Sequence, residues 1–285
     1  PLCISHERTF LAAAKKVIVQ VNPNLPRTRG DTALHIRDVD MIVEAATPLP
    51  YLPKSQPTQV DQAIGQYVAS LVNDGDTIQL GIGGIPDAAA MSLMDKHELG
   101  LHTEMLTNSI VDLIDAGVIT NRRKTLHKDR CICTFALGTQ ELYDMVDDNP
   151  GVEFYSASYV NDPRVIGQND NFVSVNSALA VDLTGQICSE SIGPRQYSGT
   201  GGQNDFGEGA AYSKGGRSII CVKASKKGGT LSSIVGQHAP GSVVTMSRNT
   251  VDYVITEFGI APIKGRSVRQ RVDNLIAVAH PDFRA

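Results

Sequence analysis

The chain has 285 residues, of which 41% are hydrophobic and 20% are charged, as is typical of a globular protein. Its net charge of -4 gives no positive field for nucleic acid or an anionic membrane surface, and no apolar run approaches the roughly 20 residues that span a bilayer. The five cysteines are odd in number and scattered, and no signal-peptide pattern is present, so we expect reduced thiols and a cytoplasmic location.

The first part of the chain predicts a helix that leads into an apolar strand over residues 7–21, and a second short strand over residues 40–44. A proline-dense stretch follows from Thr47 to Pro57. Proline fixes φ and removes backbone donors, so this stretch is typical of a linker. We therefore place a domain boundary near residue 53.

A βα pattern begins after the proline-dense stretch. Apolar spacing predicts a helix over 61–72, a buried strand over 77–80, and a helix from Pro86 through Met94. A strand-like segment then reaches Glu104. Ser109 is expected to begin the next helix, with Asp112 as its capping-box acid.

Strands dominate the rest of the chain, and residues 179–188 have the pattern of a hairpin. Strands are predicted over residues 131–135, 172–175, 179–183, 186–188, 218–222 and 251–255. Strands that alternate with helices predict an open α/β sheet, with some antiparallel strands. The pair Cys131 and Cys133 could indicate a metal site, but zinc pairs usually have two intervening residues and a partner pair elsewhere, so we expect a strand and no metal.

Ligands of open α/β sheets bind beyond the carboxyl ends of strands, and the run Gly81–Pro86 falls at such a position. A dinucleotide fingerprint would need glycine at the sixth position of this run, where Pro86 stands. A tight turn remains possible, as does a loop whose N–H groups bind a phosphate or an oxyanion.

Glu104 comes at a strand end, two residues after His102, where a carboxylate can face the cleft, although spacing alone favours an ordinary solvated glutamate. Ser198–Phe206 holds three glycines in four residues, which fits either a flexible loop or a second anion-binding nest. Glu190 and Glu257 are rival carboxylates. Walker A, nucleophile-elbow and H-E-x-x-H motifs are absent from the sequence.

Five segments together resemble the acetyl-CoA hydrolase/transferase family, with the 4-hydroxybutyrate and butyrate CoA-transferases as the closest branch. They are Gly81–Ala88, Leu101–Met105, Ser198–Phe206, Thr256–Ala261 and Ala279–Arg284. The resemblance implies a CoA-transferase-type (NagB/RpiA-like) open sheet with flanking helices. It further implies that residues 1–53 are the tail of a first domain, and that residues 54–285 are a second domain truncated at its end.

The same resemblance implies a ping-pong mechanism through an acyl anhydride and a glutamyl-CoA thioester. Glu104 is then the nucleophile, and the backbone N–H groups of Ile82 and Gly202 are the oxyanion donors. The implied CoA contacts are Gln79, Leu80, Gly81, Ile82, Gly83, Leu179, Gly201 and Gly202. Lys223 or Lys226 could meet the CoA phosphates, but a solvated lysine fits as well.

The expected partners are acyl-CoA and short-chain carboxylates, with coenzyme A as a substrate and no permanently bound cofactor. A homo-oligomer, either dimer or tetramer, is the default expectation. Three other functions stay open: an acyl-CoA hydrolase with the same nucleophile, a non-catalytic CoA-binding subunit, and, more remotely, a dinucleotide-dependent oxidoreductase.

Overall fold

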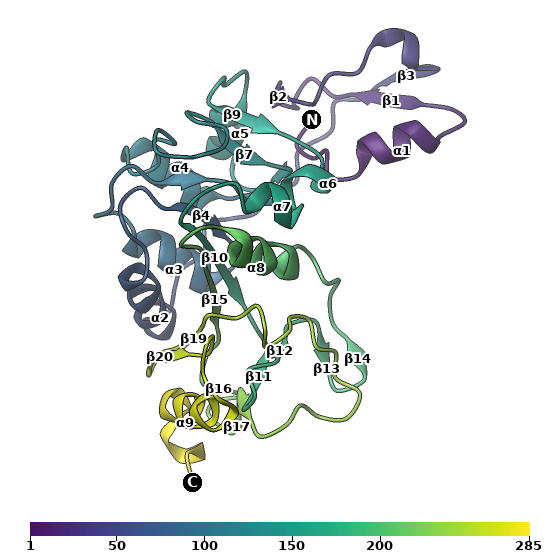
Figure 1. The fold of residues 1–285 in the computed structure, drawn as a ribbon. Helices are drawn as coiled ribbons and strands as arrows, with labels where there is room; N and C mark the ends of the chain where they lie inside the picture. The colour runs from purple at the N-terminus through teal and green to yellow at the C-terminus, as the bar shows by residue number, and fades with distance from the viewer.

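The computed structural model describes residues 1–285, with a six-stranded sheet at its centre (Figure 1). The strand order is β20-β19-β15-β10-β4-β5, and every pair is parallel except β19 with β20. The strands are β4 (Thr77–Leu80), β5 (Gly100–Leu101), β10 (Phe172–Ser177), β15 (Arg217–Cys221), β19 (Tyr253–Thr256) and β20 (Gly259–Pro262). The predicted open α/β sheet with some antiparallel content is confirmed.

The order of the strands reverses between β4 and β10. From β4 the chain passes through α3 (Gly84–Ser92) to β5 on one side, whereas from β10 it passes through α8 (Gln203–Tyr212) to β15 on the other. Crossovers between parallel strands are right-handed, so the two helices must cover opposite faces of the sheet. Figure 1 shows α3 and its partner α2 (Gln59–Ser70) on one side of the sheet and α8 on the other.

Smaller sheets and short helices surround this centre. The remaining helices are α1 (Glu7–Ala13), α4 (Asn108–Asp115), α5 (Gln140–Val146), α6 (Ala157–Val160), α7 (Pro163–Ile166) and α9 (Val268–Val278), with 3-10 turns at Ile36–Asp38 and Pro281–Phe283. The small sheets are β1 (Ile18–Val21) with β3 (Met41–Glu44), β2 (Arg29–Gly30) with β9 (Val152–Phe154) and β7 (Cys131–Cys133), and β6 (Met105–Leu106) with β8 (Phe135–Ala136). The others are β12 (Ile187–Cys188) with β11 (Ala180–Asp182) and β18 (Ile234–Val235), β13 (Ser191–Ile192) with β14 (Arg195–Gln196), and β16 (Ser225–Lys226) with β17 (Leu231–Ser232).

The largest hydrophobic cluster, of 32 buried residues, lies between the central sheet and the helices α2–α5. All four residues of β4 are buried, including the polar Thr77 and Gln79, as expected of a central strand that is covered on both faces. Ile4 belongs to this cluster and Leu49 packs against it, so parts of residues 1–53 contact the rest of the protein. The strands β1 and β3 extend away from this body and are largely exposed (Figure 1). The domain boundary near residue 53 stays a prediction.

Two local predictions were wrong. The predicted strand over 131–135 is broken at Thr134, because β7 pairs with β9 whereas β8 pairs with β6. The helix expected to begin at Ser109 with a capping box has Thr107 at its N-cap and no side-chain capping bond. Asp112 instead accepts a hydrogen bond from Lys54 Nζ at 2.8 Å. Because the helix begins at Asn108, its third residue is Ile110, whose side chain cannot accept a capping bond, and Asp112 lies beyond the capping position.

The predicted hairpin over 179–188 is confirmed, with Ala180 opposite Cys188 in an antiparallel pair. Asp182 stabilises its turn by accepting bonds from the backbone N–H groups of Thr184 at 2.9 Å and Gln186 at 3.0 Å. No helix in the structure has both the length and the apolar character that are needed to cross a membrane.

Candidate active site

A cavity of about 330 Å³ opens at the carboxyl ends of β4 and β10. These two strands flank the point where the strand order reverses, which is where open α/β sheets bind their ligands. Seven of the predicted site residues line the cavity: Gln79, Leu80, Gly81, Ile82, Glu104, Gly201 and Gly202. The topology therefore brings together segments that are separated by more than a hundred positions in the sequence.

The first glycine-rich segment joins β4 to α3. Gly83 is the N-cap of α3 and has φ of 107°, a conformation that favours glycine strongly over other residues. The Ile82 side chain is 57% exposed, and its N–H donates to no protein acceptor. The positive end of the α3 dipole and this unpaired N–H both favour a negative charge at the cavity.

The second glycine-rich segment joins β14 to α8, where Gly202 is the N-cap without a side-chain capping bond. The Gly202 N–H also donates to no protein acceptor. Two helix N-termini, from opposite faces of the sheet, therefore meet at one cavity. This arrangement could stabilise an oxyanion from two directions.

Glu104 lies in the bend between β5 and β6, so the strand that was expected to reach it ends earlier, at Leu101. Its carbonyl oxygen accepts from the backbone N–H groups of Thr134 at 2.9 Å and Phe135 at 3.2 Å. The break at Thr134 between β7 and β8 therefore holds the Glu104 backbone. The side chain is half-buried and lines the cavity.

Asn161 is a contact of Glu104 that the sequence reasoning missed. Its Nδ2 donates to Glu104 Oε2 at 3.1 Å, across 57 positions of sequence. A side chain at Gly202 would collide with the same Glu104 oxygen, so glycine is required there for the carboxylate to approach the loop. The only local signal was the turn pattern Asn161-Asp162-Pro163, which says nothing about Glu104.

Asp205 is a second acidic group close to this pair. Burial raises the pKa of Asp205, a hydrogen bond from Asn161 opposes that effect, and the negative charge of Glu104 adds to it. Asp205 and Asn161 both line a separate cavity of about 490 Å³. The Asn161 amide therefore lies between two carboxylates.

His102 is fully buried and is not part of the cavity lining. Burial and the positive charge of Lys124 lower the pKa of His102 to about 3, so the ring stays neutral at physiological pH. It therefore supplies no general acid or base.

The rival carboxylates lie away from the cavity lining. Glu190 is buried, and its backbone carbonyl accepts from Tyr197 and Ser198. Glu257 Oε2 accepts from the backbone N–H of Ala224 at 2.8 Å. Neither carboxylate shares Glu104's position at the reversal of the strand order.

Four other candidates also lie outside this lining: Gly83, Leu179, Lys223 and Lys226. Lys223 Nζ pairs with Asp61 Oδ1 at 2.9 Å, and Lys226 Nζ donates to the Leu179 carbonyl at 2.7 Å. Both lysines therefore have partners within the protein. The possible metal pair, Cys131 and Cys133, is buried, and burial raises the pKa of both thiols.

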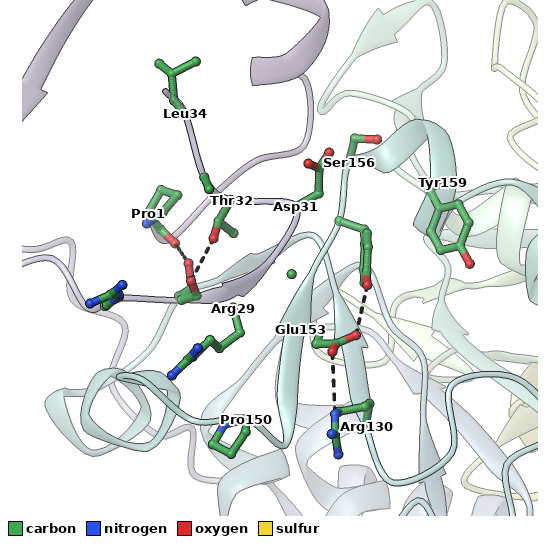
Figure 2. Close-up of a pocket in the computed structure, with 15 residues that line it drawn as sticks. Pro1, Arg29, Asp31, Thr32, Leu34, Arg130, Pro150, Glu153, Ser156 and Tyr159 are labelled. Carbon is green, nitrogen blue, oxygen red and sulfur yellow. Dashed lines mark hydrogen bonds and ion pairs between the residues drawn. The ribbon is translucent and has the colours of Figure 1, made fainter. Parts of the chain in front are cut away.

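A larger cavity, of about 1140 Å³, lies near the N-terminus and contains none of the predicted site residues (Figure 2). Its charged groups are partly paired, since Arg130 meets Glu153 at 3.6 Å and Glu153 accepts from Tyr155 at 3.0 Å. Pro1 is part of its wall, held by a hydrogen bond from Thr28 at 2.9 Å. Size alone therefore does not identify the functional cavity.

Comparison with known proteins identifies the family of this chain. The acetyl-CoA hydrolase/transferase C-terminal domain matches residues 138–285, and the N-terminal domain of the same family matches residues 2–53. The chain is 51% identical over 283 residues to a 4-hydroxybutyrate coenzyme A transferase of Clostridium kluyveri, covering 99% of this chain and 66% of that protein. It is 49% identical to the succinyl-CoA:cyclohexane-1-carboxylate CoA transferase of Geobacter metallireducens, covering 99% and 65%.

The crystal structure of RipA from Yersinia pestis superimposes with a TM-score of 0.94 at 42% identity, covering 99% of this chain and 64% of that one. The chain thus spans about two thirds of the length of the relatives it matches. One family domain alone accounts for more than half of the 285 residues. This chain belongs to the acetyl-CoA hydrolase/transferase family.

Proposed function

We propose that the protein carrying this chain is an acyl-CoA:carboxylate CoA-transferase that works by ping-pong through a glutamyl-CoA thioester on Glu104. One observation carries the proposal: the Glu104 carboxylate lies at the reversal of the strand order, beside two loops with unpaired N–H groups. The relatives named as CoA transferases support it.

In the first half-reaction, a Glu104 oxygen attacks the thioester carbonyl of the acyl-CoA. The carbon–sulfur bond breaks, CoA leaves as a thiolate, and an acyl-glutamyl anhydride remains. The thiolate then attacks the Glu104 carbonyl carbon, which expels the first carboxylate and forms the glutamyl-CoA thioester. A second carboxylate reverses these steps and leaves as the new acyl-CoA. The anhydride conserves the thioester's energy, so covalent catalysis divides the transfer into steps of low barrier.

Each attack creates a tetrahedral oxyanion, and we assign its stabilisation to the N–H groups of Ile82 and Gly202. Loss of one oxyanion donor in other enzymes costs about 3 kcal/mol. Gln79 to Gly83, Leu179, Gly201 and Gly202 are the proposed CoA contacts. Of these, Gly83 and Leu179 lie outside the cavity lining, so their contacts would be with parts of CoA beyond it.

Apolar side chains line the cavity beside Glu104, namely Leu80, Met105 and Phe135. They suit the hydrocarbon part of a short-chain acyl group. The two relatives of nearly equal identity are named for different acids, 4-hydroxybutyrate and cyclohexane-1-carboxylate. We propose short-chain carboxylates as the substrate class on the basis of the apolar lining, and the individual acid stays open.

The second candidate function is an acyl-CoA hydrolase, which the family description includes. Water that reached the anhydride or the thioester would convert the transferase into a hydrolase. The half-buried position of Glu104 favours transfer. Measuring CoA exchange into added acetate against free CoA release distinguishes the two reactions. A CoA-binding subunit without catalysis would bind CoA and form no adduct.

We also propose that residues 1–53 end a first domain and that residues 54–285 form most of a second. The polypeptide is expected to act in the cytoplasm as a homo-oligomer, a dimer or a tetramer. Light scattering of the complete protein after size exclusion tests the oligomer.

The decisive experiment incubates the complete protein with butyryl-CoA, without an acceptor, and maps the adduct by peptide mass spectrometry. We expect a CoA adduct on the peptide that holds Glu104, lost in Glu104→Gln. Glu190→Gln and Glu257→Gln are the matched controls, and both should keep the adduct.

An adduct on either control residue would overturn the assignment of Glu104 while preserving the mechanism. Intact butyryl-CoA with no adduct on any glutamate would overturn the transferase itself. Free CoA released without an adduct, even after rapid quenching, would favour hydrolysis.

A further inference from the structure

The buried ring of His102 makes one hydrogen bond whose direction is fixed. Its Nε2 lies 2.8 Å from the backbone carbonyl oxygen of Val160. A carbonyl oxygen only accepts, so the neutral ring must carry its proton on Nε2. Nδ1 is then an acceptor, and it has no partner. The ring therefore acts as a single directed donor.

Two aromatic side chains hold this ring in place. The rings of Phe172, on β10, and Phe206, on α8, meet His102 edge-on at centroid distances of 6.2 and 6.3 Å. Phe172 and Phe206 in turn stack on each other at 6.2 Å. These contacts and the complete burial of His102 restrict rotation of the imidazole, which keeps its Nε2–H directed at the Val160 carbonyl.

Val160 is the last residue of α6, and Asn161 follows it as the C-cap. The Asn161 side chain donates to Glu104 Oε2, and Glu104 is two residues after His102 in the chain. Two hydrogen bonds and two short chain segments therefore form a closed circuit: His102 to Val160, then Asn161 to Glu104. The circuit fixes α6 in register with the bend that carries Glu104.

We propose that His102 is a positioning residue for the transfer reaction, which acts through Val160 and Asn161 to hold one oxygen of Glu104 and leave the other free to attack. The inference rests on the proposed role of Glu104. It assigns the histidine before the nucleophile a task that needs neither charge nor contact with substrate.

An alternative is that His102 only fills space in the core, because it belongs to no polar network other than this bond. A space-filling residue would tolerate loss of the donor if its volume were kept. It would also affect folding stability without affecting the Asn161–Glu104 bond. The two roles therefore predict different results for substitutions that differ in their donor.

The test compares His102→Leu, which removes the donor, with His102→Gln, whose amide can donate from a similar position. The rate of glutamyl-CoA thioester formation is measured in single turnover on the complete protein, and butyryl-CoA affinity is measured in a Glu104→Gln background. We expect His102→Leu to slow thioester formation about tenfold or more, and His102→Gln to recover most of the rate, with affinity unchanged.

A double-mutant cycle shows whether the effect passes through Asn161. If it does, His102→Leu should slow the Asn161→Ala variant by no more than about twofold. His127→Phe is the matched control, because His127 Nε2 pairs with the Tyr159 hydroxyl of the same helix at 2.7 Å but makes no bond to the α6 backbone. This control should leave the rate within about twofold of the unsubstituted protein.

The positioning role would be overturned if the rate losses of His102→Leu and Asn161→Ala multiplied in the double variant. It would also be overturned if His102→Leu formed the thioester at an unchanged rate. If His102→Leu does not fold, His102→Asn replaces it, since its shorter amide cannot reach Val160. The side-chain amide resonances of Asn161, followed by NMR, give a readout that does not depend on catalysis. A wild-type protein that formed no thioester would refute the proposed function, whereas resonances that moved only in the donor-free variants would still support the circuit.

Discussion

Gly202→Ala tests the close approach of the second glycine loop to Glu104. At Gly202 the backbone has φ of -89°, which alanine also adopts, so the substitution introduces no backbone strain. The new methyl group would instead overlap Glu104 Oε2 and would lie 2.5 Å from Asn161 Nδ2. The carboxylate is the end of a flexible side chain, so it will move rather than unfold the loop.

The expected effect on the rate is large, and the effect on stability is small. A displacement of about 1 Å of a reacting group can cost about a hundredfold in rate. We therefore expect kcat to fall about a hundredfold, with the free energy of unfolding changed by less than about 1 kcal/mol. The assay is butyryl-CoA:acetate exchange, with urea unfolding of the same samples.

The matched control is Gly199→Ala, in the same loop, where an added methyl group meets no atom within 4 Å. It should leave both measurements near those of the unsubstituted protein. If the kcat of Gly202→Ala were within about threefold of that of this control, the close contact between the loop and the carboxylate would not be needed for catalysis. If both variants lost activity equally, general flexibility of the loop would explain the loss.

Three further predictions concern stability and reactivity. Burial alone would raise the pKa of Asp61, but its bonds to the N-cap of α2 and to Lys223 outweigh this and lower the pKa below 3.8. A carboxyl group whose pKa is lower in the folded state stabilises the protein above about pH 4, and this stabilisation is lost as the pH falls and the group is protonated. Asp61→Asn should therefore reduce the free energy of unfolding at pH 7 and make it depend less on pH in the acid range, as measured by urea titrations. A steep acid dependence retained in Asp61→Asn would contradict this. Asp182→Ala should cost about 2 kcal/mol in urea unfolding, because it leaves the donors of the β11–β12 turn without their acceptor; a loss under about 0.5 kcal/mol would show that water replaces the carboxylate. Of the five cysteines only Cys3 is exposed, so a thiol reagent should label one thiol in the native protein and five after denaturation. Fast native labelling of a second thiol would contradict the buried strand positions.

The sequence predicted the main strands because each is a local pattern. Residues 77–80 and 172–175 are short segments rich in apolar residues that follow turn signals, and both became central strands. The errors came where tertiary contacts override local preference. The helix that was expected to begin at Ser109 begins at Asn108, whose side chain bonds to Leu52 and Thr139, so Asp112 no longer lies at the capping position.

For the site, spacing alone predicted two glycine loops and several rival glutamates, and the family resemblance selected Glu104. The fold then separated the candidates by position. Glu104 lines the cavity at the strand-order reversal, whereas Glu190 and Glu257 lie elsewhere and make backbone contacts of their own. These roles stay predictions until an adduct is mapped.

By itself the sequence determined the central strands β4, β10, β15 and β19, the two glycine-rich segments and the family, since these follow from neighbouring residues and ordered motifs. Only the tertiary structure decided that Asn161 holds Glu104 and that His102 holds Val160. The physical reason is that such contacts join residues about 60 positions apart. Their meeting depends on strand order and crossover handedness, which no local pattern encodes.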